Sequence, residues 1–539
     1  MPSKLSAYWH TAKNTKPSQL LFRISKKLHL KCDLGVRPGP YRGQYYAVPT
    51  VPELDFDPSF LLRFPAEELM AGNVMFLNHK QFLNPYDTWD DPKQSPLWNF
   101  NLHYFEFLFP LIQVYQQSGN PACLNKIKDF ISGWISQNPQ SKKGNGWQPY
   151  TAAVRLANWL SCFSYLEQAF AEDEQFKNKL LASIYEQFYF LATHLEKDIL
   201  ANHYFEDLKA LVLCSLFFDD KHMLKASIQA LKKQCAEQIL SDGMHFELSP
   251  MYHKIILEDL IRVAVALRAR GIAILELEDT LKRMLNAAYS LEAGLQRLPL
   301  FNDCGSNVAK SLDALLRVGE NHFQIVPVFQ DYLPAAGYYI FRNGPWTLIV
   351  DAGSPGAQYT PGHAHCDAMS FELFKNGLPV LVNCGTYAYQ SDLRTFFRST
   401  SAHNTVMVND VEQSQCWGIF RMGKRSTVRV LNRSQQGLTM QMKDQKNQIV
   451  RRTLLLADNQ LTVSDHAKGH KLTANYHLLG NTTKTASGLW TNEHVGLCRV
   501  IAEKCRLSSH PYAEEYGKLS EAGVIELEGM DDLHFSISF

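Results

Sequence analysis

The segment that decides the fold is Gly362-His363-Ala364-His365-Cys366-Asp367-Ala368-Met369-Ser370-Phe371-Glu372-Leu373. It places two histidines two residues apart and then continues as an alternating apolar segment. Because residues i and i+2 of a β-strand point to the same side, we expect His363 and His365 to share one face where a strand begins. One of them could then act on a substrate while the other holds a metal ion.

From about residue 320 onward, the sequence has the pattern of short antiparallel strands. Asn376-Gly377 separates two apolar runs and is typical of a tight hairpin turn. Many short strands with closely spaced turns indicate an antiparallel β-sandwich, to which we assign residues 326–539. The predicted strands lie near 338–344 (with its turn), 346–350, 371–374, 378–382, 405–408, 426–431, 438–442, 449–455, 460–464 and 472–477.

The residues before this region, from Trp98, repeat apolar positions every three or four residues, as in Leu156, Trp159, Leu160 and Phe163. This period predicts amphipathic helices, and short connections join such helices into antiparallel hairpins. Hairpins in a ring form an α/α toroid and hairpins in a line form a solenoid, between which periodicity does not choose. The predicted helices cover roughly 102–118, 122–137, 151–170, 174–196, 204–218, 222–240, 254–271 and 277–294.

The chain therefore divides into an N-terminal extension (1–50), a helical domain (51–325) and the β-sandwich (326–539). The basic segment Arg23–Lys31 of the extension could form a short amphipathic helix on a surface or partner, but we expect a solvated helix face. The two domains would meet near 320–335 and leave a cleft, which is a favoured place for a ligand site.

Composition narrows the class of protein. The 539 residues are 45% hydrophobic and 20% charged, with a net charge of +1, so we expect a globular protein with no nucleic acid partner. The eleven cysteines include no CxxC pair, which indicates reduced thiols. No apolar run reaches signal-peptide or membrane-spanning length. We therefore expect a cytoplasmic location and no membrane-spanning segment, with a periplasmic location as the alternative.

Three further polar clusters accompany the histidine pair. Asn202-His203 opens a predicted helix, where Asn202 is a plausible N-cap and Glu206 and Asp207 are favourable in the first turn. Ser249-Pro250 is a typical helix start, shortly before Tyr252. The third cluster is Ser401-Ala402-His403-Asn404-Thr405, at a strand start. Asn302-Asp303-Cys304-Gly305 we interpret as a turn between the domains.

These motifs, in this order, resemble the heparinase II/III-like polysaccharide lyases, which include oligoalginate lyases. The matching stretches are Asn101-Leu102-His103-Tyr104-Phe105-Glu106, Trp147-Gln148-Pro149-Tyr150 with Arg155, Asn202-His203, Ser249–His253, Gly362–Asp367 and Ala402-His403-Asn404-Thr405. The resemblance implies a multidomain α+β protein: an N-terminal α/α toroid of helical hairpins, a C-terminal antiparallel β-sandwich, and the substrate between them. It also implies cleavage of a uronic-acid polysaccharide by β-elimination.

That reaction explains the residue types. The proton next to a uronate carboxylate is weakly acidic, so the charge that develops on the carboxylate must be stabilised, a task that suits Asn202 and His363. A base then takes the proton and an acid protonates the leaving oxygen. Tyr252 could do one or both if positive neighbours lower its pKa from ~10, and His203 is the other candidate. The stereochemistry of the uronic acid decides which of the two takes the C5 proton.

The resemblance assigns sugar binding to side chains at the mouth of the toroid. Arg155 could pair with a carboxylate or sulfate of an acidic polysaccharide or oligosaccharide, while we expect Tyr104 to serve helix packing. The substrate-binding residues implied by the resemblance are Asn101, His103, Trp147 and Arg155.

A structural metal site, usually zinc, is also implied in the β domain, with His365, Asn383 and His403 as ligands by position. Imidazole is a good zinc ligand. Asn383, however, stands where the family has a carboxylate, and an amide oxygen is a poor zinc ligand. Either the site is weak or empty, or Cys384, Cys366 or Asp367 compensates.

Two other functions compete with a uronan lyase. One is an enzyme that trims or modifies a cell-surface polymer, such as a capsule, exopolysaccharide or O-antigen, within its assembly system. The other is a non-catalytic glycan-binding protein that has kept the fold. Intact Asn202, His203, Tyr252 and His363 argue against the second.

Overall fold

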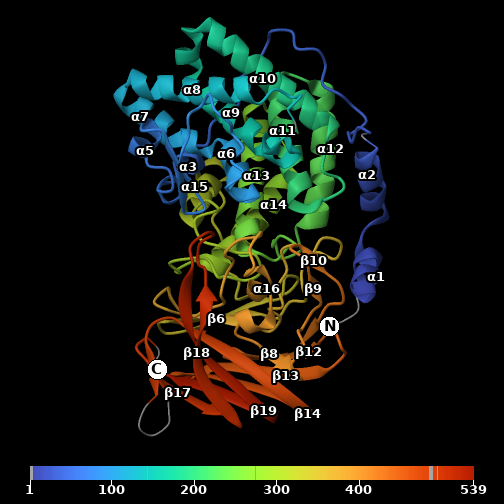
Figure 1. The fold of residues 1–539 in the computed structure, drawn as a ribbon, viewed down its shortest axis with the longest axis vertical. Coiled ribbons are helices and arrows are strands. Elements are labelled where there is room, and N and C mark those ends of the chain that lie inside the picture. The colour runs from blue at the N-terminus through green and yellow to red at the C-terminus, as the bar shows by residue number, and fades with distance from the viewer. Residues whose placement is uncertain (1–3, 29, 143, 274, 485–489, 495) are drawn as a thin grey trace.

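The computed structural model describes residues 4–28, 30–142, 144–273, 275–484, 490–494 and 496–539. The described chain is helical up to residue 323 and mainly antiparallel strand from residue 332. Figure 1 shows the two parts stacked along the long axis of the molecule. The predicted fold class, a helical domain followed by an antiparallel β domain, is confirmed.

The helical part forms two layers of alternating helices. The inner layer holds α6, α9, α11, α13 and α15, each in contact with the next, while α8, α10, α12 and α14 lie outside. The bounds are α1 (Lys4–Asn14), α2 (Pro17–Lys27), α3 (Pro52–Asp55), α4 (Pro58–Leu61), α5 (Ala66–Met70), α6 (Pro96–Tyr104), α7 (Phe109–Ser118), α8 (Pro121–Gln137), α9 (Pro149–Ala171), α10 (Glu174–Thr193), α11 (Ala201–Phe217), α12 (Lys221–Gln238), α13 (Pro250–Ala269), α14 (Leu275–Glu292) and α15 (Leu312–Phe323).

The inner layer curves around α3 as a ring does. Asp55 of α3 accepts a hydrogen bond from Tyr165 of α9 (3.0 Å) and forms an ion pair with Arg262 of α13 (2.8 Å). Both partners lie toward the C-terminal ends of their helices, so α3 fills the centre of the ring at that end. The N-terminal ends of α9, α11 and α13 lie at the other end, toward the β domain. They are the starting points of the functional site.

Two helix predictions were wrong in detail. The single helix predicted over 102–118 is split by Phe105, which has a φ of +64° between α6 and α7. Phe105 is fully buried and stacks on Trp89 (5.1 Å between ring centroids), so tertiary packing overrides the helical period. The helix α15, which begins after the N-cap Ser311, was not predicted.

Fifteen of the described strands form one hydrogen-bonded antiparallel sheet that folds over on itself, while β1 pairs only with β2 and β9 only with β10. The strands β14 and β19 run side by side for most of their length, and β14 then pairs with β13 in its first half and with β8 and β7 in its second. The arms that continue from these two halves enclose one apolar core, which includes Leu348, Leu373, Met440 and Leu454.

The strand bounds are as follows: β1 (Asn73–Phe76), β2 (His79–Phe82), β3 (Tyr332–Leu333), β4 (Tyr338–Asn343), β5 (Trp346–Asp351), β6 (Phe371–Lys375), β7 (Leu378–Leu381), β8 (Val406–Val408), β9 (Cys416–Trp417), β10 (Arg421–Met422), β11 (Thr427–Arg433), β12 (Gly437–Lys443), β13 (Ile449–Ala457), β14 (Gln460–Leu478), β15 (Thr482–Lys484), β16 (Trp490–Asn492), β17 (Gly496–Ile501), β18 (Lys504–Tyr512) and β19 (Ser520–Ser538). The strands predicted at 460–464 and 472–477 are both parts of β14, and β15 to β19 were not predicted. A short helix, α16 (Arg394–Phe397), lies between β7 and β8.

The two domains share an apolar interface. Met244 and Leu248 of the helical part pack in one cluster with Tyr338 and Ile349 of the β domain. A second cluster joins Met251 of α13 to Val382 and Tyr389. No described helix is long and apolar enough to cross a membrane.

Candidate active site

A cavity of about 880 Å³ opens where the two domains meet. Its walls come from the N-terminal ends of α9, α11 and α13, and from the β domain at 362–363, 389–390 and 418–421. Arg23 of α2 lines it as well. The size is in the range of small-molecule and oligosaccharide sites.

The four predicted catalytic residues all line this cavity. The Asn202 amide nitrogen donates to Glu247 Oε2 (2.9 Å) and lies 3.4 Å from His363 Nε2. The rings of Tyr252 and His363 are 4.0 Å apart. The starts of α11 and α13, which are distant in sequence, thus lie beside His363 of the β domain.

The predicted N-cap at Asn202 is wrong. The helix α11 begins at Ala201, after Leu200, and both residues have a positive φ (+52° and +66°). Asn202 is already inside the helix, and its side chain is turned toward Glu247 instead of capping the backbone. Glu206 and Asp207 accordingly lie beyond the first turn. Non-glycine residues with positive φ are strained, so this start of α11 is held in place by its surroundings.

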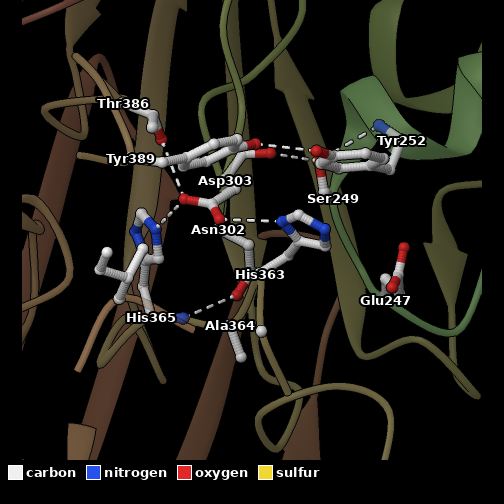
Figure 2. A network of polar contacts seen from close by, with 12 residues as sticks. Glu247, Ser249, Tyr252, Asn302, Asp303, His363, Ala364, His365, Thr386 and Tyr389 are labelled. Carbon is white, nitrogen blue, oxygen red and sulfur yellow. Dashed lines mark hydrogen bonds and ion pairs between the residues drawn. The ribbon is translucent and has the colours of Figure 1, made fainter. Parts of the chain in front are cut away.

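Asp303, interpreted above as a turn residue, is the buried anion at the centre of the site. Its carboxylate bonds His363 Nδ1 (2.9 Å) and His365 Nε2 (2.8 Å) and pairs with both guanidinium nitrogens of Arg394. Figure 2 shows it between the two imidazoles. Burial alone would raise the pKa of Asp303, but Arg394 and the two histidines lower it well below its ordinary value. Asp303 therefore fixes His363 with Nε2 facing Asn202.

Tyr252 lies at the start of α13, where Ser249 accepts its backbone N–H (3.3 Å) and donates to the Asp303 carbonyl (2.6 Å). Its hydroxyl contacts that of Tyr389 (2.8 Å), which contacts that of Tyr516 (2.9 Å). Burial and Tyr389 raise the pKa of Tyr252 well above that of an ordinary tyrosine. The expected lowering of this pKa is therefore wrong for the free protein, because no cation offsets the burial of the phenol.

His203 is hydrogen-bonded to the carboxylate of Glu196. Its Nδ1 bonds Glu196 Oε2 (2.8 Å), and its ring, 35% exposed, packs against Tyr150 (4.7 Å between centroids). Burial alone would lower the pKa of His203, but Glu196 raises it above its ordinary value. With Nδ1 engaged, Nε2 is the nitrogen left to exchange a proton.

The floor of the cavity carries charges that are already matched. Lys209 lies between Glu206 and Asp259 (2.8 Å to Asp259). Arg262 pairs with Glu258 (2.8 Å), as it does with Asp55. These cations have little charge to offer a ligand.

The predicted sugar-binding residues are divided by the structure. Asn101 lines the cavity, although its amide nitrogen donates to the Leu97 carbonyl (2.8 Å). Tyr104, expected to serve packing alone, lines it too. His103, Trp147 and Arg155 are buried and are not among the lining residues.

Arg155 serves the helix packing. Its guanidinium donates to Gln187 Oε1 (2.7 Å) and the Gly146 carbonyl (2.8 Å), and it stacks on Trp134. In this arrangement it does not reach a substrate. His103 is similarly held, since Trp134 Nε1 donates to its Nδ1 (2.9 Å).

The three residues assigned to a metal fit zinc only in part. His365 Nδ1 and both ring nitrogens of His403 are buried without a hydrogen-bond partner, and the two rings are 5.3 Å apart. The third position does not fit, because Asn383 offers an amide oxygen that already accepts the Asn404 N–H (3.1 Å). Among the described residues, no three His, Cys, Asp or Glu side chains are grouped to hold a metal ion. Cys366, Asp367 and Cys384 therefore do not supply a third ligand there.

Sequence reasoning missed the residues that orient the site, among them Glu196, Glu247, Asp303, Tyr389 and Arg394. Glu247 lies two residues before the Ser249-Pro250 helix start, and Asp303 lies in the stretch interpreted as a turn. The others carry no local signal, since their partners are between seven and 137 residues away in sequence.

The fold and the site together define a two-domain protein, a helical ring joined to an antiparallel β domain, with its cavity at the junction. The family description "Heparinase II/III N-terminus" matches residues 67–329, and "Heparinase II/III-like, C-terminal" matches residues 330–524. The chain belongs to the heparinase II/III family. The further relation to oligoalginate lyases stays a prediction.

Three curated relatives carry the name heparin-sulfate lyase. The protein of Pedobacter heparinus is 26% identical over 353 residues, which are 58% of this chain and 52% of the relative. That of Bacteroides thetaiotaomicron is 24% identical over 400 residues, 62% of this chain and 56% of the relative. The chain thus spans just over half the length of these two curated relatives.

Solved structures show the same fold. The crystal structure of heparinase III superposes with a TM-score of 0.68 at 16% identity, covering 84% of this chain and 78% of the other. A heparan sulfate lyase mutant from Pedobacter heparinus gives 0.59 at 18% identity, with 96% and 87% covered. At these identities the likeness establishes the architecture alone.

Proposed function

We propose that the chain is a polysaccharide lyase that cleaves a uronic-acid-containing polysaccharide by β-elimination. The observation that carries the proposal is the convergence of Asn202, His203, Tyr252 and His363 in one cavity between the domains. The names of the relatives support this class of reaction.

The substrate carboxylate would be bound between the Asn202 amide and His363 Nε2. As the C5 proton leaves, charge moves onto that carboxylate, and donors already in place stabilise it without reorganising. Asp303 holds the His363 ring for this contact, and Glu247 holds the Asn202 amide. Burial raises the pKa of Glu247 above its ordinary value.

The directions of the two pKa shifts support different roles for the two proton-transfer residues. His203 Nε2 takes the C5 proton, and the electrons of the C–H bond form the C4=C5 double bond as the C4–O bond breaks. The leaving oxygen takes the proton of Tyr252. A phenol with a raised pKa holds its proton until the leaving oxygen needs it, whereas Glu196 stabilises the imidazolium that forms on His203.

The charges of the cavity favour a substrate with carboxylates and little sulfate. The floor cations Lys209 and Arg262 are neutralised by carboxylates. Arg23 and Arg421 line the cavity without a carboxylate partner among the described residues, and Arg421 lies over the Trp417 ring. Two free cations suit a polymer with one charge per repeat, because dense sulfation needs more pairing groups.

The test is a panel of uronic-acid polymers, unsulfated and sulfated, followed by the ultraviolet absorbance of the unsaturated uronate. We expect product from an unsulfated polymer and less from its sulfated counterpart. Binding of a polymer without any unsaturated product would overturn the lyase and favour the glycan-binding alternative.

The division of labour has its own test, the exchange of the C5 hydrogen with D2O. The variant Tyr252→Phe keeps the base, so it should incorporate deuterium into uncleaved substrate. The variant His203→Ala should neither exchange nor cleave. The reverse pattern would assign the C5 proton to Tyr252.

A further inference from the structure

The two N-terminal helices form a strap across the domain junction. The helix α2 is docked on the helical domain through Gln19, whose Nε2 donates to the Ile199 carbonyl (3.0 Å), and through Lys26, which pairs with Asp198 (3.2 Å). The helix α1 is docked on the β domain, where Trp417 Nε1 donates to Thr11 (3.1 Å). Figure 1 shows the two helices in line along one edge of the molecule.

The outward face of this strap is apolar. Leu20, Leu21, Ile24 and Leu28 follow one another at helical spacing and form what we term the α2 stripe. Leu21 and Leu28 are each 64% exposed and Ile24 55%. On α1, Trp9 is 67% exposed, and Tyr8 is 58% exposed with one edge of its ring against Trp417 of the β domain (4.8 Å between ring centroids). The residues that dock α2, by contrast, lie on its opposite side.

The strap is also strongly basic. The first 32 residues hold seven Lys and Arg and no Asp or Glu, whereas the whole chain holds 54 basic and 53 acidic residues, so the other 507 carry a net charge of −6. Lys13, Lys27 and Lys31 are exposed and have no carboxylate partner among the described residues. The expectation of a merely solvated helix face is therefore too simple, since a solvated face has no reason to keep six large apolar side chains.

We propose that the strap binds an anionic membrane surface, with the α2 stripe, Tyr8 and Trp9 inserted among the lipid headgroups and the lysines on the phosphates. A helix with Leu and Trp on one face and a purely basic polar set is the pattern that binds at lipid interfaces. Charge selects this partner, because an anionic bilayer attracts each Lys or Arg side chain that comes near its surface. It would also repel the rest of the chain and so orient the molecule.

This docking has a consequence for the cavity. Arg23 lies on the inward side of α2 and lines the cavity, so the wall of the cavity and the lipid surface are separated by one helix, about 10 Å thick. A glycan attached to a lipid anchor would be presented beside the site.

The experiment is flotation of the full chain with vesicles of phosphatidylcholine alone or mixed with phosphatidylglycerol. We expect binding to the mixed vesicles only, weakened when salt is raised from about 0.1 to about 1 M. Leu21→Glu with Ile24→Glu should lower the bound fraction about tenfold or more. The matched control is Val326→Glu with Val328→Glu, two equally exposed apolar residues of the domain connection, which should bind as the wild type does.

Three results would overturn the proposal. The first is equal binding by both double variants, or none by the wild type. The second is self-association that only the Leu21/Ile24 variant loses in sedimentation velocity, which would make a second copy of the chain the partner. The third is retention of a soluble uronan by the strap without retention of vesicles. Circular dichroism establishes that the variants are folded.

Discussion

Asp303 couples the two sides of the site, because one carboxylate fixes both His363 and His365 and neutralises Arg394. Its pKa is lowered in the folded protein. The stability that this provides is present above the pKa of an unfolded aspartate, ~3.9, and is lost as the pH falls through the folded value. Removing Asp303 would also leave Arg394 buried without its partner, which is costly.

Tyr252→Phe tests the proton donor. The change keeps the ring and its contact with His363 but removes the hydroxyl, so we expect a folded protein whose turnover falls about 100-fold or more. Steady-state kinetics on the substrate found in the polymer panel measures this, with Tyr104→Phe as a control in the same cavity. Turnover near that of the wild type would mean that another group protonates the leaving oxygen.

Glu196→Gln tests the base through its pH dependence. His203 must be neutral to take a proton, so the acidic limb of the pH–rate profile reports its pKa, which Glu196 raises. The amide removes that charge, and we expect the limb to move to lower pH while the maximal rate falls. A limb that stays in place would show that His203 is not the titrating base.

Asn383→Asp tests the metal site. We propose that the wild type binds zinc weakly, because the third ligand is an amide oxygen instead of an anionic carboxylate. The aspartate of the variant should raise the zinc content close to one per chain. Elemental analysis after dialysis measures the content, and His403→Ala in the same background should abolish it. A full zinc content in the wild type would contradict the proposed weakness, and none in the variant would rule out the site.

At the residue scale, the sequence predicted which side chains lie together where residue type and local context agree, while the catalytic roles stay predictions. His363 and Tyr252 lie in short motifs from which we predicted a shared site, and the structure places their rings 4.0 Å apart. The prediction of sugar binding failed for Arg155, because the sequence around a single arginine does not show whether its guanidinium binds a ligand or donates to backbone carbonyls in the core. Prediction from sequence failed for Asp303 because its partners lie some 60 to 90 residues further along the chain.

At the scale of elements, the apolar period predicted which segments are helices, and the predicted helix ends agree with the structure to within four residues except where Phe105 separates α6 from α7. Predicted starts at 151, 222 and 254 fall within four residues of α9, α12 and α13, because proline or an N-cap marks each start. The strand β14 was divided in two because Lys468-Gly469-His470 resembles a turn, whereas it forms an irregularity opposite β19.

The connection between the domains gives a prediction at this scale. Residues 324–331 have no regular structure, and Val326 and Val328 are exposed, so we expect limited proteolysis to cut here early. The two pieces should remain together in size-exclusion chromatography, since the apolar clusters around Leu248 and Met251 bury the interface. Separation of the pieces without denaturant would contradict this.

At the scale of the whole molecule, the shared interface and the strap predict cooperative unfolding. Leu454→Ala in the β core removes a fully buried side chain and should cost about 2–5 kcal/mol. If the domains unfold together, the midpoint for the helices of the other domain, followed by far-ultraviolet circular dichroism, should fall with it. Two separated transitions, with the helical one unmoved, would show that the domains are independent.

The hydrogen bonds that join the hydroxyls of Tyr252, Tyr389 and Tyr516 can run in either direction along the row. Three hydroxyl protons serve two hydrogen bonds, so one end of the row always keeps an unused proton. When the bonds run from Tyr516 inward, Tyr252 keeps its proton free for the glycosidic oxygen; when they run outward, that proton is already given to Tyr389. In the proposed reaction, the direction of these two hydrogen bonds decides whether Tyr252 can donate its proton, so donation to a substrate oxygen requires the hydroxyls of Tyr389 and Tyr516 to point inward.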